Sequence, residues 1–388
     1  MPVADFRGVA IVAPTSVGYA RYSSQPADAY FAACLREMLR ATGLDKQEVD
    51  GLSASTFTLT PNPVASLSMS LGLSPRWLEA VPFGGASGVM ALRRAARAVQ
   101  SGDASVVACI GADCNPRDGF RGIVTAFSVA SIDAVRPYGD AGPTMPFAHV
   151  TRQYMDATGA TREDFGRLCV AQRFNASHCE HALLRQPTTL EDYLAAPPIA
   201  EPLHKLDLVM PCAGAEGMLV MTEKHAQTLG LPYARVRAVV ERHNAYPGEV
   251  PVLRGGWEHE REDLYSQAGC TPMDIDVVAA YDDCPAVVFM QLEGLGLCGS
   301  GDARLLVRDH DLRFCGDLPV NTSGGQLGCG QAGAAGGFLG LVEVVRQVTQ
   351  QAIGRQVPQA RIGAVAGYGM AVYDRCLGTG VAILEGSW

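Results

Sequence analysis

Two glycine-rich segments constrain the fold of this chain more than any other feature, because each stands between an apolar stretch and a helix-like stretch. The first is residues 83–88 (FGGASG), and the second is residues 321–333 (NTSGGQLGCGQAG). A glycine-rich turn before a helix allows close backbone approach and presents free N–H groups at the positive end of the helix dipole. A strand, such a turn and a helix occur twice. The sequence therefore predicts two similar α/β halves, each with a parallel sheet covered by helices.

The expected elements follow the same order in the two halves, residues 1–230 and residues 231–388. In the first half we expect strands near 9–12, 49–52, 105–111 and 218–221, with helices near 27–41 and 89–101. In the second half we expect strands near 235–242, 276–281, 362–367 and 380–384, with helices near 253–269, 285–296 and 336–351. Residues 113–210 differ in composition and interrupt the first half. We interpret them as an insertion that caps a site, with helices near 145–159 and 162–184.

Composition excludes several classes of function. The 388 residues are 48% hydrophobic and suffice for two domains of about 100–200 residues each. A net charge of −9 argues against a general nucleic-acid binder. We expect no membrane span, since no apolar run reaches about 20 residues, and we expect a cytoplasmic protein, since no signal peptide is recognisable. The twelve Cys form no CxxC pair, so we expect no metal site and mostly reduced, buried thiols.

A cluster of polar residues follows the strand expected near 276–281. It reads Tyr281, Asp282, Asp283 and Cys284. A tyrosine with its ordinary pKa of about 10 acts more easily as a proton donor or as a hydrogen-bond donor to an oxyanion than as a base. Asp282 could orient the Tyr281 hydroxyl. The alternative is a Tyr281 that packs at a strand end and has only a structural role.

The two glycine-rich segments offer few reactive side chains. Gly85 has none, and Ser87 is the nearest hydroxyl, although Ser87 could equally cap the following helix. In the second segment Gln331 could donate a hydrogen bond from its amide to a developing oxyanion. Cys329, two residues earlier, is a rival nucleophile.

The last motif lies between the two final predicted strands. It comprises Gly367-Tyr368-Gly369 and, further on, Cys376-Leu377-Gly378. Cys376 could serve as an acid/base thiol or could be a buried small residue. Tyr368 and Tyr373 are alternative acid/base groups.

Taken in order, these motifs resemble those of the thiolase superfamily, in the branch related to sterol-carrier and lipid-transfer-protein thiolases. That family carries Cys-x-x-Gly in the first glycine-rich element and Gly-His-Pro in the last, whereas this chain has Gly85 and Gln331 at those places. Where this chain has Tyr281 to Cys284, the sterol-carrier type has His-Asp-Cys-Phe and the classical type has Asn-Glu-Ala-Phe. In aldolase-like members of the branch, a Tyr at the first of these places is thought to act in C–C cleavage.

The resemblance implies a duplicated five-layer αβαβα fold, a homodimer and a cleft for a CoA ester at the strand ends. Coenzyme A would enter as part of the acyl-CoA substrate, with no permanently bound cofactor. Some bacterial members work with a small zinc-ribbon/OB-fold partner protein, so such a partner is a further expectation. The substrate-binding positions expected from the resemblance are Gly85, Ser87, Asp282, Asn321, Gly324, Gly325 and Gly369.

Three functions are consistent with these residues. The first is a Cys-independent lyase that cleaves a bulky β-hydroxyacyl-CoA by a retro-aldol reaction, with Tyr281 as acid/base and Gln331 as oxyanion donor. The second is an acyltransferase or thiolase with a displaced nucleophile at Cys284, Cys329 or Cys376. The third is a non-catalytic scaffold that binds acyl-CoA or supports a catalytic partner.

Overall fold

The computed structural model describes residues 5–59, 62–117, 119, 142–372 and 374–387. Its central feature, within these residues, is a nine-stranded mixed sheet of order β3-β2-β4-β7-β1-β8-β11-β10-β9. The strands of the first half are β1 (Val9–Ala20), β2 (Gly51–Ser55), β3 (Trp77–Ala80), β4 (Val106–Asp113) and β7 (Ala213–Thr222). Those of the second half are β8 (Tyr233–His243), β9 (Val277–Ala280), β10 (Ile362–Val372) and β11 (Arg375–Ser387).

Strand pairing shows the duplication that the element order predicts. β2 pairs in parallel with both β3 and β4, and β9 pairs in parallel with β10. A parallel bridge between Val278 and Val320 occupies the place that β3 takes in the first half. The halves meet where β1 pairs with β8, through Ala10 with Arg235 and Ile11 with Ala234.

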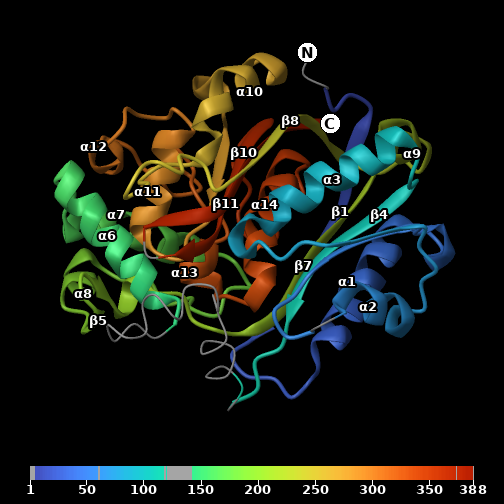
Figure 1. The fold of residues 1–388 in the computed structure, drawn as a ribbon, viewed down its shortest axis with the longest axis horizontal. Coiled ribbons are helices and arrows are strands. Elements are labelled where there is room, and N and C mark those ends of the chain that lie inside the picture. The colour runs from blue at the N-terminus through green and yellow to red at the C-terminus, as the bar shows by residue number, and fades with distance from the viewer. Residues whose placement is uncertain (1–4, 60–61, 118, 120–141, 373, 388) are drawn as a thin grey trace.

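Helices complete a five-layer αβαβα arrangement, which confirms the predicted fold class. α3 (Ser87–Ser101) and α14 (Gly336–Val348) lie between the two halves of the sheet, and α3 contacts strands of both. α1 (Ala27–Thr42) and α2 (Pro63–Leu71) cover the outer face of the first half, and α10 (Arg261–Ala268) and α11 (Pro285–Gly294) cover that of the second (Figure 1). α9 (Glu223–Thr228) connects β7 to β8.

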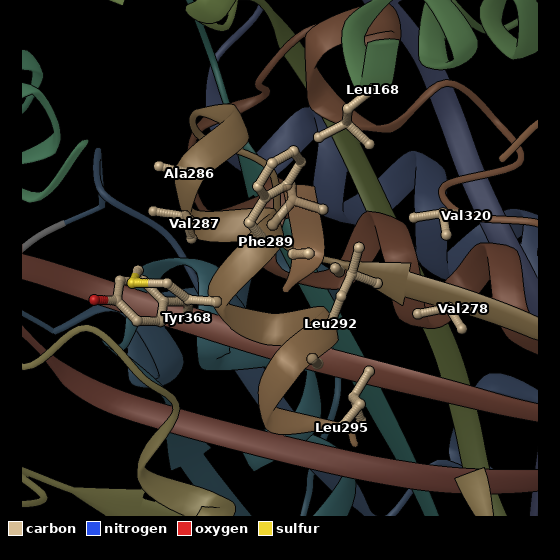
Figure 2. Packing of buried hydrophobic residues seen from close by; sticks show 14 of the residues in the cluster. Leu168, Val278, Ala286, Val287, Phe289, Leu292, Leu295, Val320 and Tyr368 are labelled. Carbon is tan, nitrogen blue, oxygen red and sulfur yellow. The ribbon is translucent and has the colours of Figure 1, made fainter. Parts of the chain in front are cut away.

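The insertion packs against the second half, although it leaves from the first. Its described elements are α6 (Thr144–Thr158), α7 (Arg162–Ser177), α8 (Leu190–Leu194), β5 (Pro198–Ala200) and β6 (Leu203–His204). α6 contacts β10 and α11, while α7 contacts α11, α12 (Ala303–Asp309) and α13 (Gly325–Cys329). Leu168 of α7 therefore joins Phe289 and Leu292 of α11 in one buried cluster with Val278 (Figure 2). No helix among the described residues is long and apolar enough to cross a membrane.

Glycines allow the N-terminal ends of α3 and α14 to meet. Each helix follows a single 3₁₀ turn, Gly84–Ala86 before α3 and Gly333–Ala335 before α14. A Cβ on Gly88 would lie 2.3 Å from the carbonyl oxygen of Gly337, and a Cβ on Gly337 would lie 2.2 Å from that of Gly84. Any side chain at these positions would separate the two helices. The close approach brings two positive helix ends to one place, and the candidate site forms there.

Candidate active site

A cavity of about 210 Å³ opens where the two helix N-terminal ends, the end of β9 and the insertion converge. Its walls come from both glycine-rich segments, from the loop after β9, from β10 and from α6 of the insertion. Of the residues expected at the site, the cavity is lined by Gly85, Tyr281, Gln331, Tyr368 and Gly369. Segments far apart in the sequence thus supply one concave surface, as is usual for a small-molecule site.

Tyr281 occupies the space that a side chain at position 85 would need. A Cβ built on Gly85 would lie 2.3 Å from Cε2 and Cζ of the Tyr281 ring, far inside van der Waals contact. Gly85 therefore serves as more than a flexible turn residue, because its missing side chain makes room for the aromatic ring. A cysteine at position 85 and the ring of Tyr281 exclude one another in this arrangement.

Gln331 joins Tyr281 to Asp283. Its amide nitrogen Nε2 donates to the Tyr281 hydroxyl over 3.2 Å and to Oδ1 of Asp283 over 2.8 Å. A side-chain amide carries two hydrogens, so both are engaged. Gln331 is therefore arranged as a positioning residue, whereas the sequence suggested that it donates directly to an oxyanion.

The pKa shifts of Tyr281 and Asp283 give the two residues different roles, Tyr281 as an acid and Asp283 as a base. Burial, and then the nearby charge of Asp283, raise the pKa of Tyr281 well above its ordinary value, so its hydroxyl stays protonated at neutral pH. Burial and repulsion from Asp282 raise the pKa of Asp283 to about 7, although the hydrogen bond from the Gln331 amide opposes this rise. Near neutral pH Asp283 can therefore both accept and return a proton.

Asp282 does not line the cavity. Its carboxylate accepts from the backbone N–H groups of Gln326 (2.9 Å) and Leu327 (3.0 Å) and from the side chain of Gln172 (2.6 Å). It thereby holds the first turn of α13 and leaves Tyr281 to be oriented by Gln331. The pKa of Asp282 is raised to about 6, chiefly by burial.

The remaining expected binding residues do not line the cavity but support the segments that form its walls. Asn321 fixes the end of β9, because its amide accepts from the Ala280 N–H and donates to the Ala280 carbonyl, both over 2.9 Å. Gly324 and Gly325 begin α13 with positive φ. Ser87 is fully buried, donates to the Val81 carbonyl over 2.9 Å and accepts from the N–H of Phe83.

The suggested nucleophilic thiols do not line the cavity either. Cys329 donates to the carbonyl of Ser323 over 3.2 Å, and Cys376 donates to the carbonyls of Gly369 and Gly378. Cys284 is buried at the start of α11 beside Thr151. Burial raises the pKa of the Cys284 and Cys376 thiols, which disfavours the reactive thiolate. Tyr373, another alternative, lies outside the described residues.

Two residues to which the sequence assigned no role, Asp113 and Asp283, line the cavity. Asp113 accepts from the hydroxyls of Thr56 (2.8 Å) and Thr58 (2.7 Å) and from the N–H of Ala334 (2.8 Å), so it ties the loop after β2 to the start of the second 3₁₀ turn. Cys114 and Cys212 also contribute to the wall. No group of three His, Cys, Asp or Glu suited to hold a metal ion occurs in the part of the chain that the structure describes.

Several known proteins are similar to this chain. The family model described as "Thiolase C-terminal domain-like" matches residues 249–382. The steroid side-chain-cleaving aldolase of Thermomonospora curvata is 32% identical over 355 residues, which cover 87% of this chain and 89% of that protein. The 17-hydroxy-3-oxo-4-pregnene-20-carboxyl-CoA lyase of Mycobacterium tuberculosis is 29% identical over 386 residues, which cover 95% of this chain and 98% of that protein. The solved Ltp2-ChsH2(DUF35) aldolase matches with a TM-score of 0.85 at 28% identity, over 98% of each chain.

Fold and site together define a protein of thiolase type in which a tyrosine ring occupies the space beside Gly85. The chain belongs to the thiolase superfamily, in the branch that contains the sterol-carrier-protein thiolases and the aldolase-like proteins that act on CoA esters.

Proposed function

We propose that this protein is a carbon–carbon lyase that cleaves a bulky β-hydroxyacyl-CoA by a retro-aldol reaction, without an acyl-enzyme. The observation that carries the proposal is the packing of the Tyr281 ring against Gly85, with its hydroxyl joined to Asp283 through Gln331. An attacking thiol has no room there, whereas an acid and a base stand side by side. The activities named for the Thermomonospora and Mycobacterium relatives support the same reaction class.

The residues present can perform every proton transfer that the reaction needs. Asp283 takes the proton of the β-hydroxyl group, and the electrons of the Cα–Cβ bond move to the thioester carbonyl as that bond breaks. The β-carbon leaves as an aldehyde or ketone. The enolate oxygen accepts a hydrogen bond from the protonated Tyr281 hydroxyl, aided by the positive ends of α3 and α14. Asp283 then returns its proton to Cα, which yields the shortened acyl-CoA and restores the carboxylate.

Replacement of Tyr281 by Phe tests this assignment. Phe keeps the ring over Gly85, so the variant should fold, but it removes the proposed oxyanion donor. We expect kcat/KM for cleavage of β-hydroxyacyl-CoA esters to fall about 10²–10³-fold. The matched control is Tyr265→Phe, since that hydroxyl donates to the Leu295 carbonyl away from the cavity. Cleavage by Tyr281→Phe at the rate of the Tyr265→Phe control would remove Tyr281 from the mechanism.

We also propose that this chain works together with a second polypeptide. The solved relative is an assembly named Ltp2-ChsH2(DUF35), which supports a small partner protein for this chain as well. We further propose a homodimer that resides in the cytoplasm and takes coenzyme A only as part of its substrate. Light scattering on the purified chain, alone and co-expressed with a candidate small partner, measures both associations. A monomer that cleaves its substrate unaided would contradict them.

A further inference from the structure

Tyr368 presents a buried hydroxyl group that is unpaired within the described part of the chain. The residue lies on β10, its side chain is 1% exposed, and its hydroxyl has no hydrogen-bond partner among the described residues. A buried polar group without a partner loses its hydration and receives nothing in exchange, so it destabilises the folded state. Such groups are rare in native proteins, and each requires an explanation.

The other buried tyrosines of the hydrophobic cluster that contains Tyr368 are all paired. The hydroxyl of Tyr154 donates to Glu293, that of Tyr193 to Asp207, and that of Tyr265 to the carbonyl of Leu295. These three lie in the same hydrophobic cluster as Tyr368. Among these four, Tyr368 is the one that lines the cavity. The residue with the unpaired hydroxyl is therefore also the one at the cavity wall, where a ligand would bind.

The local backbone directs Tyr368 away from the first glycine-rich turn. Its neighbours Gly367 and Gly369 face that turn, where a Cβ on either would meet the backbone of Ala86 or Phe83 within 3 Å. Because side chains alternate along a strand, Tyr368 points to the opposite face of β10, beside α11. Figure 2 shows its hydroxyl directed away from the side chain of Leu292.

The cavity also has apolar side chains in its wall. Phe147, Leu208 and Val209 line it, and they belong to or pack against the hydrophobic cluster that contains Tyr368. α6, which carries Phe147, packs against β10. An acyl group whose reacting carbons lie at Asp283 would thus extend over apolar side chains, with one hydroxyl among them.

We propose that the Tyr368 hydroxyl donates a hydrogen bond to an oxygen atom of the acyl group, so that the site selects CoA esters whose acyl group carries an oxygen beyond the β-hydroxyl. This inference rests on the proposed function for the identity of the ligand. Burial raises the pKa of Tyr368 well above its ordinary value, which keeps the phenol protonated as a donor. A site with a buried donor discriminates strongly against ligands that leave that donor unpaired.

A binding experiment tests the selection independently of turnover. The probes are 3-phenylpropanoyl-CoA and its 3-hydroxyphenyl and 4-hydroxyphenyl counterparts, which lack the β-hydroxyl and cannot be cleaved, titrated into wild-type protein and Tyr368→Phe by calorimetry. We expect the wild type to bind at least one hydroxyphenyl ester about tenfold more tightly than the phenyl ester, and Tyr368→Phe to lose that preference. Equal affinities for all three esters in the wild type, or a preference that survives in Tyr368→Phe, would overturn the proposal. If these affinities are as expected but the corresponding β-hydroxy esters are not cleaved, the lyase assignment alone is contradicted.

Thermal stability of the ligand-free protein gives a second, independent readout. Tyr368→Phe removes an unpaired hydroxyl and should leave Tm unchanged or raise it. Tyr265→Phe removes a paired hydroxyl of similar burial and should lower Tm. A loss of Tm in Tyr368→Phe equal to that of the Tyr265→Phe control would show that the hydroxyl has a partner within the protein, which would contradict the proposal.

Discussion

Replacement of Gly85 by Ala should inactivate the protein by displacing Tyr281. The new Cβ would lie 2.3 Å from the ring, whereas carbon atoms pack at about 3.5–4.0 Å, so the ring must retreat by roughly 1.2–1.7 Å. Such overpacking typically costs about 1–3 kcal/mol. A misplacement of about 1 Å lowers the rate about 10²-fold. The Tyr281 hydroxyl would also leave the amide of Gln331, now 3.2 Å away.

The assay combines kcat/KM for CoA-ester cleavage with the free energy of unfolding. Gly18→Ala is the matched control, since a Cβ there meets nothing within 4 Å. The double variant Gly85→Ala/Tyr281→Ala should regain about 1–3 kcal/mol relative to the sum of the single changes, because the clash is gone, while cleavage stays lost. If Gly85→Ala matches Gly18→Ala in both activity and stability, the steric argument is refuted.

Two further predictions concern the other titratable groups. Asp283→Asn should remove the rise of activity with pH that has its midpoint near the Asp283 pKa of about 7. Since that pKa is raised from 3.8, the folded state loses stability as pH rises towards and through 7, so Asp283→Asn should raise Tm relative to wild type at pH 8 but not at pH 4. A pH–rate profile unchanged by the substitution would exclude Asp283 as the base. Cys329→Ala and Cys376→Ala should each keep kcat/KM within about twofold, because neither thiol lines the cavity. A loss above tenfold in a folded variant would instead support that cysteine as a displaced nucleophile.

The fold could be predicted from sequence because its signals are local and repeated. The apolar stretches near residues 105–111 and 276–281 and the amphipathic stretch near 27–41 appear as β4, β9 and α1. The glycine-rich segments marked both helix N-terminal ends. The apolar residues before Asn321 form only the single bridge of Val320 with Val278, because the chain continues at once into the turn that α13 requires.

The separate roles of the polar residues at the site could not be predicted from the sequence. Asp282 and Asp283 are chemically alike, and only the backbone path after β9 turns Asp283 into the cavity and Asp282 towards α13. The amide hydrogens of Gln331 are taken by partners 48 and 50 residues away in the chain. The unpaired hydroxyl of Tyr368 is likewise a property of packing, since it depends on what surrounds β10 and not on the Gly-Tyr-Gly sequence.

The absence of an acyl-enzyme is the central claim, and intact-protein mass spectrometry with parallel analysis of CoA products tests it most directly. The protein is incubated with β-hydroxyacyl-CoA and β-ketoacyl-CoA esters, with a candidate partner present and absent. The lyase mechanism predicts a shortened acyl-CoA together with the aldehyde or ketone from the β-hydroxy esters, at an unchanged protein mass. A stable increase in protein mass equal to an acyl group, located on Cys114, Cys212 or any other thiol, would contradict it.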